Sequence, residues 1–195
     1  MRGSSGKFDV VVVGVSAGGV DLLLALLPKL PANFPVPIVV CLHAAIGMTL
    51  DLARLLEART DIAVCEAHDK DALEGGCVYL APGGYHLLLE RDLTASLSLD
   101  PPVRFARPSI DVLFDSAAHA IRERTLAVIL SGANDDGAVG ARRIKDAGGT
   151  LIVQDPATAQ VPEMPRAAIA AAEPDEIFSP QALPALLARL CKAES

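Results

Sequence analysis

Three kinds of side chain that together perform acyl transfer follow three apolar runs of this sequence. Ser16 comes after "VVVVGV", and His43 comes after "VPIVVCL". Asp135 and Asp136 come after "TLAVIL", within the loop "SGANDDGAVG". A histidine makes a serine nucleophilic by taking its proton, and a carboxylate orients the histidine and stabilises its charged form. These residue types predict a serine hydrolase, provided that the fold brings them together.

Each of these residues also has a purely structural interpretation. Ser16 is a suitable cap for a helix that follows it, and Asp136 is a suitable N-cap before Gly137. His43 is also typical of a histidine that packs in a core or a crevice. The catalytic interpretation rests on the three residue types falling together at the ends of predicted strands.

The glycine-rich turn "VGVSAGG" around Ser16 is also typical of a phosphate-binding loop. A dinucleotide-binding fingerprint requires Gly-x-Gly-x-x-Gly at this point and an acidic residue at the end of the second strand. Ser16 replaces the middle glycine, His43 replaces the acidic residue, and the sequence has no Gly-Lys-Ser/Thr for a P-loop. The nucleotide-binding interpretation therefore fails two of its requirements.

The pattern Gly14-x-Ser16-x-Gly18 matches the nucleophile elbow of the α/β-hydrolases. Those enzymes place their histidine after the acid, whereas the last histidine of this chain is His119, which precedes Asp136. The elbow also comes before any strand that would carry the oxyanion loop. The sequence therefore excludes an ordinary α/β-hydrolase, but it allows a triad in the order Ser, His, Asp because triads are defined by geometry.

Short apolar runs alternate with amphipathic segments along the chain. Strands are predicted at 8–15, 36–44, 61–67, 125–132, 148–155 and 175–178, and helices at 20–30, 49–58, 110–122 (N-cap Ser109), 137–147, 164–172 and 181–192. Residues 75–100 predict a small antiparallel excursion. The alternation predicts a doubly wound α/β fold, with a mostly parallel sheet and helices on both faces. In such sheets the active crevice lies at the carboxyl ends of the strands.

Composition limits the classes of function. The chain has 195 residues, 24 of them acidic and 17 basic, and this net charge of −7 argues against a nucleic-acid partner. No apolar run reaches the roughly 18 residues of a membrane span, and the N-terminus has no secretory signal. We therefore expect no membrane insertion and a cytoplasmic location. None of the four cysteines forms a Cys-x-x-Cys pair, so we expect free thiols, no metal and no cofactor.

Taken together, the motifs resemble the catalytic domain of the CheB family, the chemotaxis protein-glutamate methylesterases. The resemblance extends from about residue 8 to about residue 180 and depends on the order and spacing of several segments, each of which is weak alone. The matching segments are "VGVSAGG" (13–19), "VVCLH" (39–43), "VYLAPGGYHLLL" (78–89), "RPSIDVLFDSAA" (107–118), "AVILSGANDDGAVG" (127–140) and "QDPATAQVPEMPRAAI" (154–169).

The resemblance implies a triad of Ser16 as nucleophile, His43 as general base and Asp136 as the orienting carboxylate. Asp136, rather than Asp135, matches the aspartate that precedes glycine in the family's loop. The implied reaction is hydrolysis of glutamate γ-methyl esters on the cytoplasmic helices of methylated chemoreceptors, and some members also deamidate glutamines. The alternative is a catalytically degenerate member that binds or regulates receptor helices.

Several residues near the expected crevice depart from the family pattern. Ala17 stands where the family usually has threonine, and the Gly-Met-Gly turn reads Gly132-Ala133-Asn134. The backbone N–H groups of Ala17 and Ala133 still suit an oxyanion hole. Met164 lies in a segment that differs from the usual Phe-Gly-Met-Pro, and we expect it at the crevice. Arg107 is a candidate crevice or substrate residue, and its alternative is a surface ion pair.

We expect a tail at residues 1–7, disordered or left over from cloning, and a methylesterase-like catalytic domain at 8–195. The family's N-terminal receiver domain has no counterpart before the first predicted strand. We therefore expect a stand-alone catalytic domain or one cut from a longer chain. Phosphorylation control is not implied, and regulation by a separate protein is one alternative.

Overall fold

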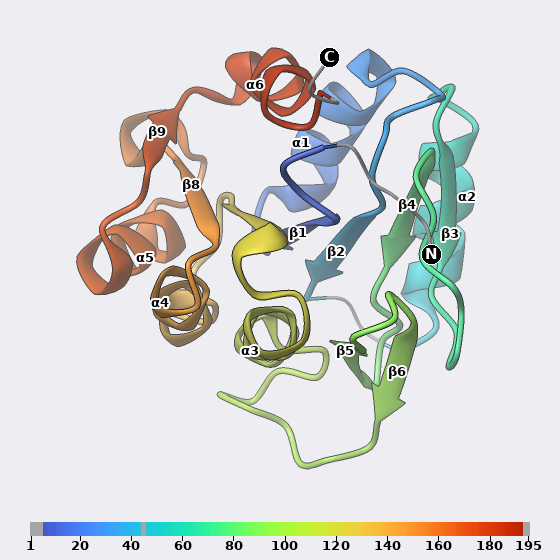
Figure 1. Ribbon diagram of the computed structural model, residues 1–195, viewed down its shortest axis with the longest axis horizontal. Helices are drawn as coiled ribbons and strands as arrows, with labels where there is room; N and C mark the ends of the chain where they lie inside the picture. Colours follow the sequence, from blue (N-terminus) through green and yellow to red (C-terminus); the bar gives the residue numbers. More distant parts are fainter. Residues whose placement is uncertain (1–5, 44–45, 193–195) are drawn as a thin grey trace.

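A parallel sheet of seven strands forms the centre of the computed structural model, which describes residues 6–43 and 46–192 (Figure 1). Its strand order is β3-β4-β2-β1-β7-β8-β9. The strands are β1 (Val10–Val15), β2 (Ile38–Leu42), β3 (Ala63–Glu66), β4 (Cys77–Leu80), β7 (Thr125–Ile129), β8 (Thr150–Gln154) and β9 (Glu176–Phe178). The predicted doubly wound α/β fold is confirmed.

Helices cover both faces of the sheet. The helices are α1 (Gly19–Leu26), α2 (Met48–Glu57), α3 (Ile110–Ala120), α4 (Ala138–Asp146), α5 (Glu163–Ala172) and α6 (Leu183–Leu190), with short 3-10 turns at Leu27–Lys29, Arg122–Arg124, Pro156–Thr158 and Pro180–Ala182. Helices α1, α2 and α6 pack on one face, and α3, α4 and α5 pack on the other. Pro28 explains why the predicted helix at 20–30 ends early, since a 3-10 turn replaces the last helical turn.

Buried aliphatic side chains on both sides of β1 fix it at the centre of the molecule. Val11, Val13 and Val15 pack in the core beneath α1, whereas Val10 and Val12 pack in the core beneath α3. All five valines are buried. This explains why the strand reads as a continuous apolar run rather than an alternating one.

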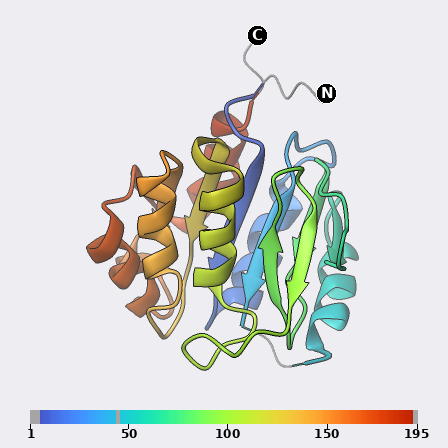
Figure 2. The same cartoon turned by 60° about the horizontal axis from the view of Figure 1, so that its bottom comes forward.

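The antiparallel excursion is smaller than the sequence predicts. It consists of the hairpin β5 (His86–Leu89) and β6 (Ala95–Ser98), which lies beside α3 on the same face as α4 (Figure 2). Residues at the start of the predicted excursion instead form β4, a parallel strand of the main sheet between β2 and β3. A run of only four apolar residues does not reveal whether its neighbour is parallel or antiparallel.

Two glycines let α3 approach the carboxyl end of β1. A β-carbon on Gly14 would lie 2.4 Å from Cγ2 of Ile110, the first residue of α3. A β-carbon on Gly137 would lie 2.7 Å from the same atom, and the φ of +95° at Gly137 also favours glycine. Close packing at Ile110 therefore brings the N-terminus of α3 to the end of the sheet.

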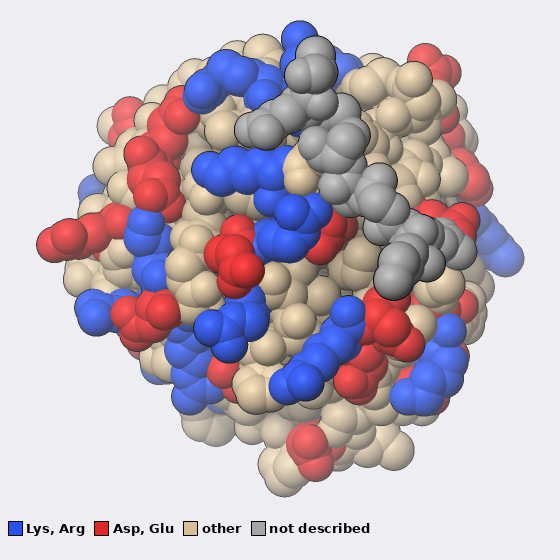
Figure 3. All heavy atoms as spheres, viewed as in Figure 1, with Lys and Arg blue, Asp and Glu red and all other residues tan. Residues whose placement is uncertain are grey.

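Charged side chains of both signs are interspersed over the face in Figure 3, without a basic stripe on that face. Within the described part of the chain, none of the helices has the length and apolar character needed to cross a membrane.

Candidate active site

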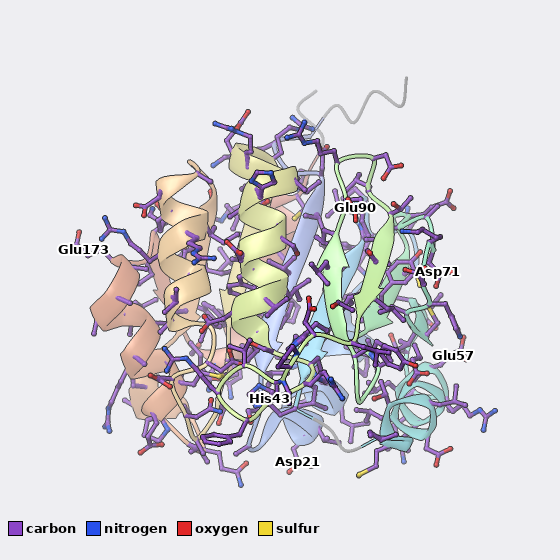
Figure 4. All side chains as sticks on the ribbon, turned by 90° about the horizontal axis from the view of Figure 1, so that it is seen from below. Asp21, His43, Glu57, Asp71, Glu90 and Glu173 are labelled. Carbon is purple, nitrogen blue, oxygen red and sulfur yellow. The ribbon has the colours of Figure 1, made fainter. Side chains whose placement is uncertain are left out.

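Ser16, His43 and Asp136 meet at the carboxyl end of the sheet. Ser16 follows β1, His43 follows β2, and Asp136 lies in the loop between β7 and α4. Strands β2 and β7 pair with opposite edges of β1, so the three residues meet where the strand order reverses. In Figure 4, His43 lies among the loops at the end of the sheet where α3 begins.

The three side chains form one hydrogen-bonded chain. Nδ1 of His43 lies 3.0 Å from Oγ of Ser16, and Nε2 of His43 lies 2.7 Å from Oδ2 of Asp136. A carboxylate only accepts hydrogen bonds, so Nε2 carries the proton of the neutral ring and Nδ1 is free to accept one from Ser16. The ring is 16% exposed and the carboxylate is fully buried, so Asp136 holds the ring while its other edge faces the crevice.

Burial alone would raise the pKa of Asp136, but hydrogen bonds reverse the shift. The His43 ring, the backbone N–H groups of Asp111 and Ile110, and the Ser109 hydroxyl all donate to its carboxylate, so its pKa lies below the ordinary value. Two of these donors are the first N–H groups of α3, where the helix dipole also favours a negative charge. Asp136 is therefore a buried anion beside the imidazole.

The capping interpretations of Ser16 and Asp136 are not supported. Gly18, not Ser16, occupies the N-cap of α1, and Gly137 occupies the N-cap of α4. Asp136 does bind a helix N-terminus, but it is that of α3, a different helix from the one it precedes. Ser109 occupies the predicted N-cap position of α3, yet its hydroxyl donates to Asp136 rather than capping its own helix.

With this geometry in view, residues 11–187 match the family model described as CheB methylesterase. The chain belongs to the CheB methylesterase family. A protein-glutamate methylesterase/protein-glutamine glutaminase of Anaeromyxobacter dehalogenans is 42% identical over 95% of this chain and 54% of its own length. A Leptospira interrogans relative is 43% identical over 94% of this chain and 95% of its own length.

The crystal structure of the CheB methylesterase catalytic domain of Thermotoga maritima has the same fold. Its TM-score with this chain is 0.90 at 36% sequence identity, and the match covers 94% of this chain and 98% of that one. The Thermotoga maritima relative named protein-glutamate methylesterase/protein-glutamine glutaminase is 38% identical, and this chain spans 54% of its length. The resemblance that the sequence motifs carried is confirmed at the level of family and fold.

Backbone contacts hold Ser16 in place at the end of β1. The Ser16 N–H donates to the carbonyl of Ser131 at 2.9 Å, and the Ser16 carbonyl accepts from the N–H of Gly19 at 2.8 Å. Among the described residues, none accepts a hydrogen bond from the N–H of Ala17 or from that of Ala133. The role of these two N–H groups in an oxyanion hole stays a prediction.

Two hollows meet at His43. The first, which we call the serine crevice, has a volume of about 610 Å³. Ser16 and His43 line it together with the apolar side chains of Val20, Leu42, Met48, Leu52 and Leu55. The second, the loop hollow, has a volume of about 440 Å³ and is lined by His43, Asn134 and residues 104–108. A larger hollow of about 1120 Å³ between the β5–β6 hairpin and α3 includes neither Ser16 nor His43.

Of the two remaining predicted crevice residues, one faces a hollow and one does not. Arg107 lines the loop hollow, and its Nη1 donates to the carbonyl oxygens of Leu99 and Asp100. The prediction for Met164 is wrong, because its side chain is fully buried and packs behind Gly132. A β-carbon on Gly132 would lie 2.6 Å from Cε of Met164, so this methionine supports the loop rather than lining the crevice.

Residues that support Asp136 were not predicted from the sequence. Asp111 accepts from the N–H groups of Gly137 (3.0 Å) and Gly140 (2.7 Å) at the start of α4. Burial raises the pKa of Asp111, and the nearby charge of Asp136 acts in the same direction. Nε of Arg104 lies 3.3 Å from Oδ2 of Asp111, which places a cation beside the two carboxylates. Asp111 stands in the quoted segment "RPSIDVLF", where an acidic residue in a first helical turn is a detectable signal.

Ser131 joins three loops of the site. Its hydroxyl donates to the carbonyl of Ala17 at 2.8 Å and accepts from the N–H of Val161 at 3.0 Å. Its own N–H donates to the side chain of Gln154. The hydroxyl of Ser131 therefore ties the loop that follows Ser16 to the loop at Val161, and its backbone N–H ties both to Gln154 of β8.

Proposed function

We propose that this chain hydrolyses glutamate γ-methyl esters on the cytoplasmic helices of chemoreceptors, with Ser16, His43 and Asp136 as a catalytic triad. The single observation that carries the proposal is the unbroken hydrogen-bonded chain from Oγ of Ser16 through His43 to Asp136. Membership of the CheB methylesterase family and the names of the relatives support the ester as the substrate class.

In the first half of the reaction, Ser16 Oγ attacks the γ-carbonyl carbon of the ester while its proton passes to Nδ1 of His43. Asp136 stabilises the imidazolium that forms, because its carboxylate is already held as an anion against Nε2. The N–H groups of Ala17 and Ala133 are our candidates for stabilising the oxyanion. Methoxide then leaves with the proton of Nδ1 as methanol, and the glutamyl group remains on Ser16.

The second half returns the enzyme to its starting state. Water gives a proton to Nδ1 of His43 and attacks the acyl carbon, and the tetrahedral intermediate collapses with Ser16 Oγ as the leaving group. His43 then returns the proton to Ser16, and the product is the glutamic acid side chain, which loses its own proton to solvent and becomes the carboxylate. Asp21 and Asp51 border the serine crevice. Their negative charges repel the anionic carboxylate product but not the neutral ester, which favours release of the product.

Deamidation of glutamine is a second candidate reaction, because it follows the same steps with ammonia in place of methanol. Relatives of this chain carry both activities in their names. Amides are poorer acyl donors than esters, and the same triad would act on both. Measuring methanol from methylated receptor and ammonia from unmethylated receptor separates the two activities.

The test is methanol release from methylated receptor by the wild-type chain and by Ser16→Ala. We expect Ser16→Ala to lose about 10³-fold or more in kcat. Folded wild-type protein that binds receptor but releases neither methanol nor ammonia would instead support a degenerate binding or regulatory module.

A further inference from the structure

A tight turn beside His43 holds two bulky residues in the left-handed backbone region. Val103 and Ala106 exchange both backbone hydrogen bonds, at 3.1 and 2.9 Å, and the two residues between them are Arg104 (φ 49°) and Phe105 (φ 65°). Two successive positive φ angles define a type I′ turn, which favours Asn-Gly because glycine adopts this region without steric cost. An Arg-Phe pair here is a backbone outlier that the rest of the structure must offset.

Ion pairs of the Arg104 side chain offset the backbone strain at the first of these two residues. Its guanidinium forms ion pairs with Asp135 and with Asp111, whose carboxylate binds the start of α4. The side chain of Arg104 therefore ties the turn to the loop that carries Asp136. The strained conformation of Arg104 is offset by interactions within the chain.

Phe105 gains no comparable burial. Its side chain is fully exposed (103%), although an aromatic ring in a folded protein normally contributes by removing apolar surface from water. The same residue lines the loop hollow together with His43. The chain thus holds an aromatic ring in solvent, in an unfavourable conformation, at the edge of the proposed active site.

A second apolar rim faces the other side of His43. Met48, at the start of α2, is 61% exposed and lines the serine crevice, and Ile46, two residues before it, is 79% exposed. His43 lines both hollows, so exposed apolar side chains stand on each side of the ring that would act as the base. This arrangement suits a substrate whose ester is flanked by apolar side chains.

We propose that Phe105 is a specificity-determining contact for the protein part of the substrate. Its ring would pack against an apolar side chain about one helical turn from the esterified glutamate, since residues three or four apart share one face of a helix. A small ester that reaches Ser16 through the serine crevice would gain little from this contact. The inference rests on the proposed function, because it assumes that the ester is presented on a receptor helix.

The experiment compares two substrates for each variant, methylated receptor and p-nitrophenyl acetate. Phe105→Ala and Phe105→Gly should each lower kcat/KM on receptor about tenfold more than on p-nitrophenyl acetate, the loss of one modest apolar contact. Phe105→Tyr, which keeps the ring, should restore most of the receptor activity. Ile177→Ala is the matched control, because Ile177 is a half-exposed apolar residue on β9, and it should leave the ratio of the two activities unchanged.

The alanine and glycine variants of Phe105 also measure the backbone strain at this position separately from recognition of the substrate. Alanine keeps the β-carbon in the left-handed region and glycine removes it, so Phe105→Gly should melt about 2–4 °C above Phe105→Ala. Equal losses on both substrates, or no loss on either, would overturn the role of Phe105. These outcomes differ from failure of the proposed function, in which folded wild-type protein would release no methanol from receptor or Ser16→Ala would release it as fast as the wild type.

Discussion

Asp111 and Asp136 each bind the N-terminus of the helix at whose start the other residue lies. Asp136 immediately precedes the N-cap of α4 but accepts hydrogen bonds from the first N–H groups of α3, at 2.8 and 2.9 Å. Asp111 lies in the first turn of α3 but accepts from the N–H groups of Gly137 and Gly140 in α4, at 3.0 and 2.7 Å. The two carboxylates therefore link the starts of α3 and α4, and the position of Asp136 depends on both sets of hydrogen bonds.

Removal of Asp111 should lower both stability and turnover. Asp111→Ala leaves two buried N–H groups of α4 without their acceptor, which costs about 1–3 kcal/mol in the free energy of unfolding. We expect kcat to fall about tenfold, because the loop that carries Asp136 loses its anchor, while KM changes little. Asp111→Asn keeps one acceptor oxygen and should lose less in both quantities. Urea unfolding and steady-state kinetics measure these effects.

The control is Asp115→Ala on the same helix. Asp115 forms an ion pair with Arg143 and is about half exposed, so its loss should cost less than about 1 kcal/mol and leave kcat unchanged. If Asp111→Ala behaved like Asp115→Ala, the hydrogen bonds from the start of α4 to Asp111 would have no part in positioning Asp136.

The lowered pKa of Asp136 predicts how stability depends on pH. A carboxyl group whose pKa is lower in the folded chain than in the unfolded chain stabilises the fold fully above its ordinary value of 3.8. That contribution is lost as pH falls below this value through the folded-state pKa. Asp136→Asn cannot titrate, so the unfolding free energy of the wild type should fall relative to that of this variant as pH is lowered below 3.8. A difference between the two free energies that stays constant as pH is lowered would contradict the lowered pKa.

Close packing at Gly14 should be required for the site to form. Gly14→Ala places a β-carbon 2.4 Å from Cγ2 of Ile110, so α3 must move away from β1, at a cost of about 1–3 kcal/mol. The N–H of Ile110 would then move away from Asp136. The double variant Gly14→Ala/Ile110→Ala removes the clashing methyl group, and its destabilisation should be smaller than the sum of the two single changes. If the destabilisation of the double variant equalled the sum of the two single destabilisations, Gly14 and Ile110 would not be in contact.

The fold and the meeting of Ser16, His43 and Asp136 could be predicted from the sequence, because both depend on strong local signals. Continuous valine runs predict buried parallel strands, and Ser16, His43 and Asp136 each follow such a strand directly. The support of Asp136 by Asp111 and Ser109 was missed, because it depends on how α3 and α4 pack rather than on spacing along the chain. The error at Met164 has a similar origin, since a residue near a motif can lie behind the loop it supports.

The strain at Phe105 was also beyond sequence reasoning. Arg-Phe carries no turn signal, because the residues that favour a type I′ turn are glycine, asparagine and aspartate. The structure places the turn there through the reciprocal hydrogen bonds of Val103 and Ala106 and through the ion pairs of Arg104. A residue that contradicts local preference in this way is more informative about function than one that obeys it.

Covalent labelling of the chain by a fluorophosphonate tests whether Ser16 is a nucleophile activated by His43. Mass spectrometry of the digested wild-type protein should find the adduct on Ser16, with labelling reduced at least about tenfold in His43→Ala and absent in Ser16→Ala. Thermal unfolding of each variant establishes that it is folded. An adduct on another residue, or equal labelling of the wild type and folded His43→Ala, would contradict the triad.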